Sequence, residues 1–62
     1  MENERILKTK DLIEILGLGK TKTYQMLQLK IIPATKVGHQ YLIIESELLK
    51  WLKSNIDKEI FI

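Results

Sequence analysis

The sequence contains no cysteine and only one histidine among its 62 residues. Without cysteine the chain forms neither a disulfide nor a thiolate metal site, and a single histidine leaves too few ligands for a structural zinc ion. Serine occurs only as Ser46 and Ser54, so the sequence also offers no evident nucleophile paired with a general base. We therefore expect a protein that is not an enzyme and that uses no metal, no cofactor and no small-molecule substrate.

Long hydrophobic runs are missing as well. No stretch of about 18 apolar residues exists, so we expect no transmembrane segment, and the charged N-terminus lacks the apolar core of a signal peptide. Hydrophobic residues still make up 45% of the chain, which is too many for a disordered segment. The length predicts one domain over residues 1–62, with a core of about 6–55 and a C-terminal tail at 56–62. We expect it in the cytoplasm, without membrane contact.

Acidic residues are absent from the thirty residues 15–44. The lysines of this window give it a net charge of +4, while residues 1–14 and 45–62 each have a net charge of −1. The window's basic residues are Lys20, Lys22, Lys30 and Lys36. Lysines concentrated in one part of a small domain are the electrostatic feature expected of a nucleic-acid binder.

Apolar spacing predicts two short helices separated by a tight turn. The first helix is expected over about residues 10–16, with Thr9 as its N-cap and a glycine just past its end. The second is expected over residues 20–29, with Gly19 as its N-cap. Its apolar face is opposite a polar face that carries no acid. Two helices joined by the three-residue turn 17–19 form a helix-turn-helix pattern.

The second half of the chain predicts a hairpin and a third helix. Pro33 keeps its preceding residue out of helical geometry, and two β-prone runs around Gly38 then predict a hairpin over about residues 35–43. A third helix is expected from Glu45 or Ser46 to about Asn55. Its inward stripe is expected to consist of Leu48, Leu49, Leu52 and Ile56. Residues 5–8 are compatible with a short strand. The predicted fold is mainly α, a winged helix-turn-helix of three helices and a two-stranded wing.

In a helix-turn-helix pair the second helix can enter the major groove of DNA. Lysines at its start lie where the helix dipole favours a phosphate, and Gln25 and Gln28 could each make a bidentate contact with adenine. The lysines are equally compatible with an ordinary solvated surface, and glutamines such as Gln25 and Gln28 are more often neutral surface residues than base contacts. The candidate DNA-binding residues are Lys20, Thr21, Lys22, Tyr24, Gln25 and Gln28 on the helix, and Lys36, His39 and Gln40 on the hairpin.

Three segments of the chain, residues 16–24, 32–38 and 48–52, resemble in order and spacing the excisionase and AlpA-like branch of the MerR-type winged helix-turn-helix domains. The resemblance covers roughly residues 6–53. Two departures concern the second helix. Gly19 stands where the family usually has a serine N-cap, and Lys30 stands where it usually has a glycine after the helix.

The resemblance implies a function in DNA recombination or regulation. Excisionases of this kind bind duplex DNA in tandem near a recombination site, bend it and direct an integrase toward excision, and related small proteins regulate transcription on phages and mobile elements. The implied partners are double-stranded DNA and an integrase or recombinase, or a second copy on adjacent sites. The alternative is a protein-interaction module, an adaptor or inhibitor, that uses Leu29, Ile31 and the apolar C-terminal tail.

Overall fold

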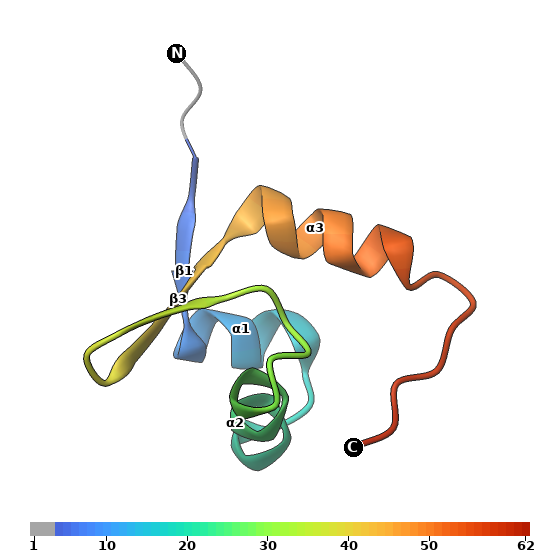
Figure 1. Cartoon of the computed structure of the whole chain (residues 1–62), viewed down its shortest axis with the longest axis horizontal. Helices are drawn as coiled ribbons and strands as arrows, with labels where there is room; N and C mark the ends of the chain where they lie inside the picture. Colours follow the sequence, from blue (N-terminus) through green and yellow to red (C-terminus); the bar gives the residue numbers. More distant parts are fainter. Residues whose placement is uncertain (1–3) are drawn as a thin grey trace.

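The computed structural model describes residues 4–62, in which three helices pack with a small three-stranded sheet (Figure 1). The elements follow in the order β1 (Ile6–Lys8), α1 (Thr9–Leu16), α2 (Lys20–Gln28), β2 (Thr35–Val37), β3 (Gln40–Ile44) and α3 (Glu45–Ser54). This arrangement confirms the predicted winged helix-turn-helix fold. The first three residues of the expected domain lie outside the described residues.

The hairpin of β2 and β3, which we call the wing, belongs to a larger sheet than the predicted two strands. β3 is the central strand, and β1 pairs antiparallel with its other edge, so that Leu7 lies opposite Ile43. The wing turn contains two residues, Gly38 and His39, between the paired residues Val37 and Gln40. Only Gly38 has a positive φ there, 63°, which is the φ pattern of a type II′ turn. The pairing with β1 fixes the wing beside the start of α1.

The start of α1 differs from the prediction. Thr9 is the first helical residue rather than the N-cap, because Lys8, held in β1, already has the extended backbone of a capping residue. The Asp11 carboxylate accepts a hydrogen bond of 2.9 Å from the backbone N–H of Lys8. This bond satisfies one N–H at the helix start, the task that the sequence had suggested for the Thr9 hydroxyl.

Glycines shape the turn between α1 and α2. Gly17 ends α1 in the left-handed conformation, with φ 66°, as predicted. Gly19, the N-cap of α2, has φ 87° and ψ 166°, a combination that only glycine adopts readily. Its carbonyl oxygen accepts a hydrogen bond of 2.7 Å from the hydroxyl of Thr23, which is fully buried. The polar group that α2 buries is thereby satisfied within the helix.

The end of α2 is a Schellman motif built without glycine. Lys30 has a left-handed backbone with φ 60°. Its N–H donates to the carbonyl of Leu27 at 3.1 Å, and the N–H of Ile31 donates to the carbonyl of Met26 at 3.0 Å. Ile31 also packs against the core, so it is not free to form the protein contact surface considered from the sequence.

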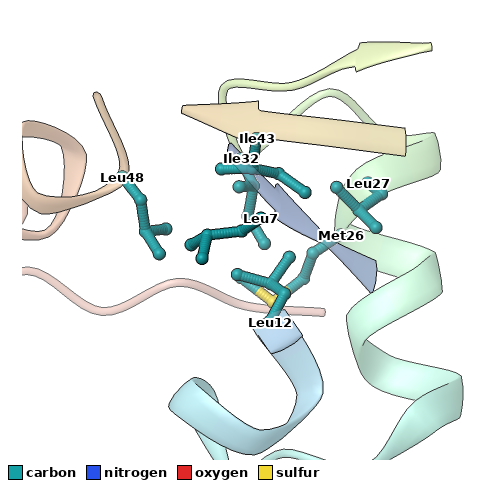
Figure 2. Close-up of a cluster of buried hydrophobic side chains, with 7 residues drawn as sticks. All are labelled: Leu7, Leu12, Met26, Leu27, Ile32, Ile43 and Leu48. Carbon is teal, nitrogen blue, oxygen red and sulfur yellow. The ribbon is translucent and has the colours of Figure 1, made fainter. Parts of the chain in front are cut away.

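The hydrophobic core draws on every element except β2 (Figure 2). Its buried side chains are Leu7, Leu12, Met26, Leu27, Ile32, Ile43 and Leu48. Figure 2 shows the side chains of α2 meeting those of β1 and α1 below strand β3. Because α2 contributes two of the seven, its outer face is held in a fixed orientation relative to the sheet.

Only part of the predicted apolar stripe of α3 faces inward. Leu48 is 1% exposed, whereas Leu49 is 50% exposed, and Leu52 and Ile56 are also exposed. The helix ends at Ser54, before Ile56, and its packing against β3 covers one narrow face. Trp51, beside that face, is partly buried against the core. The prediction that Leu49, Leu52 and Ile56 lie in the core is therefore wrong.

The C-terminal tail returns from the end of α3 toward α1 and α2 (Figure 1). Ile60 and Ile62 line an apolar cavity of about 350 Å³ together with Trp51 and Leu18, while Phe61 is 83% exposed. The tail thus borders one side of the helices, with Ile60 and Ile62 still 36% and 38% exposed and with the Phe61 ring open to solvent. No helix between residues 4 and 62 has the length and apolar character needed to cross a membrane.

Candidate nucleic-acid interface

The outer face of α2 gathers most of the candidate residues on that helix. Residues three and four positions apart share a helix face. Thr23, Met26 and Leu27 are buried and form the inner face of α2, so the opposite face of the helix is the outer one. One concave surface on the outer face is lined by Lys20, Thr21, Tyr24, Gln25 and Gln28. Five of the six helix residues predicted from the sequence therefore lie together.

Lys22 lies apart from these five residues. At 100° per residue it is roughly 130° away from the centre of the face that they share. Its side chain instead borders the apolar cavity beside the tail, near Leu18 and Ile62. The sequence predicted a single polar face on α2. In the structure Lys22 is exposed on a different side of the helix from Gln28, so the polar residues do not form one face.

A groove separates the end of α2 from the wing. Its volume is about 410 Å³, and Gln28 and Lys30 border it on the side of α2, whereas Lys36 and Tyr41 border it on the side of the wing. Lys36 lies opposite Tyr41 in the sheet, and its Nζ lies 5.6 Å from the centre of the tyrosine ring. This separation suits a cation–π contact, which holds the ammonium group over the wing.

The remaining candidates, His39 and Gln40, border a third concavity, which we call the α1–wing cleft. Its volume is about 210 Å³. The lining residues are Lys8, Thr9, Lys10, Tyr24, His39, Gln40 and Tyr41. Tyr24 borders both this cleft and the outer surface of α2, and Tyr41 borders both this cleft and the groove. The three concavities therefore form one continuous surface over α2, the wing and the start of α1.

Charge on this continuous surface is of one sign. We call this continuous surface the basic surface. No aspartate or glutamate lines any of its three concavities, and its lysines are Lys8, Lys10, Lys20, Lys30 and Lys36. Several acids instead have partners elsewhere. Glu45 pairs with Arg5 and Glu47 with Lys50, each at 3.3 Å, and Glu4 accepts a hydrogen bond from Ser46. Lysines without a carboxylate therefore line the three concavities, while these three acids are engaged with partners on other parts of the fold.

The sequence-based prediction missed Lys8, Thr9 and Lys10. They belong to the first fourteen residues, where the acidic side chains outnumber the basic ones and give a net charge of −1. The positive charge of the two lysines is therefore not evident from the net charge of that segment. Two lysines flanking a helix start were the available indication that this segment could meet an anion. Placing them beside the wing also required the pairing of β1 with β3, which connects residues far apart in the chain.

The fold and this surface define the chain as a small helix-turn-helix DNA-binding domain. A family model described as a helix-turn-helix domain matches residues 6–56, and the chain belongs to that family. Searches of curated proteins and of solved structures gave no significant match. Within the described part of the chain, no group of three or more His, Asp or Glu side chains is placed to hold a metal ion.

Proposed function

We propose that the protein binds duplex DNA with α2 in the major groove and with the wing over the neighbouring backbone or minor groove. The observation that carries this proposal is the basic surface, which extends without a carboxylate from α2 across the wing. A phosphate backbone following that surface would meet lysines from several elements. Neutralised phosphates release counterions, so the affinity should fall steeply as salt is added.

Each side chain has a role that follows from its position. Gln25 and Gln28 lie on the outer face of α2 and contact base edges. A glutamine amide can make a bidentate contact with adenine. Lys20 and Thr21 lie in the first turn of the same helix, where its N-terminus favours a phosphate. On the wing, Lys36, His39 and Gln40 contact the backbone or the minor groove. Lys22 lies away from the base-contacting face, so it contacts a phosphate and not a base.

The finer role is that of an excisionase-type directionality factor or a small transcriptional regulator of a phage or mobile element. The resemblance of residues 16–24, 32–38 and 48–52 to MerR-type excisionase and AlpA-like domains supports it. A net charge of only +2 favours modest affinity for each copy, so several copies on adjacent sites, or an integrase beside them, would be needed. Bending a site by 40–90° costs about 1–6 kcal/mol, which such added contacts could offset.

Selection of bound sequences from a random duplex pool tests this function. We expect a recurring motif, and we expect Gln25→Ala and Gln28→Ala to weaken discrimination against altered motifs by about 1–3 kcal/mol for each bidentate pair removed. Lys22→Ala is the matched control on the same helix, and it should leave the motif unchanged. Absence of duplex binding at low salt, or an affinity independent of salt, would refute the proposal.

One observation favours the alternative of a protein-interaction module, namely the exposure of Phe61. An NMR titration with duplex DNA separates the two functions. Shifts concentrated in α2 and the wing support DNA binding, whereas a chain that responds only to a protein partner, with shifts at the tail, supports the interaction module.

A further inference from the structure

The α1–wing cleft lies between α2, which the proposed function assigns to the major groove, and the wing, which it assigns to the neighbouring backbone or minor groove. Tyr24 borders it from α2, and His39 borders it from the wing turn. Lys8 borders it from the end of β1, and Lys10 borders it from the first turn of α1. The cleft therefore brings together basic and hydroxyl groups from β1, α1, α2 and the wing, and no acidic residue lines it.

Two features of the fold bring these groups together. In the sheet Lys8 lies opposite Leu42 of β3, so the chain enters α1 directly beside the wing. The two-residue turn then places His39 on the same side as Tyr24 of α2. The cleft is therefore formed by the tertiary structure, which brings several elements together, and not by the N-terminus of one helix alone.

The position of the cleft matches the path that a DNA strand would take if the proposed function is correct. In a duplex, one sugar-phosphate backbone separates the major groove from the minor groove on either side of it. If α2 lies in the major groove and the wing reaches the adjacent minor groove, that backbone must cross between α2 and the wing. We propose that the α1–wing cleft binds a phosphate of this strand, an inference that rests on the proposed function.

The groups of the cleft suit a phosphate oxygen. The ammonium groups of Lys8 and Lys10 neutralise its charge, and the Tyr24 hydroxyl donates a hydrogen bond. Neither lysine forms an ion pair with a carboxylate of residues 4–62, so binding displaces no such partner. Asp11, the nearest acid in sequence, is not a lining residue, and its carboxylate accepts the backbone N–H of Lys8.

The test compares two double variants that remove the same charge. Lys8→Ala with Lys10→Ala removes the lysines of the cleft, and Lys53→Ala with Lys58→Ala removes two lysines that line none of the three concavities. Affinity for a selected duplex and for a random duplex is measured between about 50 and 200 mM salt, conditions over which phosphate contacts change affinity strongly. Thermal melts of both variants verify that they are folded.

We expect the cleft variant to reduce the slope of log affinity against log salt by about 0.9 for every phosphate that the protein no longer neutralises. The decrease in affinity should be the same on both duplexes, and Lys8→Arg with Lys10→Arg should restore the slope. A cleft variant with the same slope as the control variant would overturn the inference while leaving the proposed function intact. Failure of the unaltered protein to bind any duplex would overturn the proposed function instead.

Discussion

Replacing Lys30 by glycine should stabilise the protein. Lys30 ends α2 with a left-handed backbone, φ 60°, and an L-residue in this conformation costs about 1–2 kcal/mol. Glycine adopts it freely but loses more entropy on folding, a disadvantage of about 0.4–1 kcal/mol. The difference predicts that Lys30→Gly raises the free energy of unfolding by about 0.5–1 kcal/mol. The two Schellman hydrogen bonds remain, because both use backbone atoms.

Circular dichroism during thermal unfolding is the appropriate assay. For a domain of this size, the expected gain corresponds to an increase in melting temperature of about 2–8 °C. Lys30→Ala is the control, because it removes the same charge but keeps the left-handed strain, and its stability should stay within about 0.5 kcal/mol of the parent. Equal melting temperatures for the glycine and alanine variants would show that the backbone of Lys30 is not strained.

Two further substitutions test the turn and the core. Gly19→Ser restores the family's usual capping residue, but it should lower the free energy of unfolding by about 1–3 kcal/mol, as measured by urea titration. The reason is the backbone of Gly19, whose φ of 87° and ψ of 166° suit only glycine, and not a steric clash, because a β-carbon there would contact nothing within 4 Å. A gain in stability would mean that the turn relaxes to a serine-capped form. Leu48→Ala should cost about 2–5 kcal/mol. The adjacent and exposed Leu49→Ala should cost less than about 1 kcal/mol, and similar losses for both would contradict the observed orientation of α3.

The sequence was sufficient to predict the features that depend on local periodicity and glycine. The burial of Met26 and Leu27 followed from helical spacing, although the same spacing placed Tyr24 on their face and Tyr24 is 37% exposed on the outer face. The end of α1 at Gly17 followed from glycine's access to positive φ. These features involve residues within a few positions of each other. Local backbone geometry therefore determines them almost completely.

Features that depend on distant partners were not predictable in the same way. Helical spacing placed Leu49 with Leu48, but it does not specify how wide a face the rest of the fold covers, and α3 has only β3 as its main partner. The contribution of Lys8 and Lys10 depends on the β1–β3 pairing, which no local pattern specifies. Helical winding placed Lys22 on the same polar side as Gln25, but the cavity that Lys22 borders includes Ile60 and Ile62, which lie nearly forty residues further along the chain.

Trp51 gives this protein a built-in optical probe of its tail. It is the only tryptophan of the chain, and it shares the apolar cavity with Ile60 and Ile62 while lining none of the concavities of the basic surface. Its fluorescence should therefore respond when the tail leaves the helices and stay nearly constant when only the basic surface is occupied. Intrinsic emission can thus distinguish movement of the tail from occupation of the basic surface without any attached label.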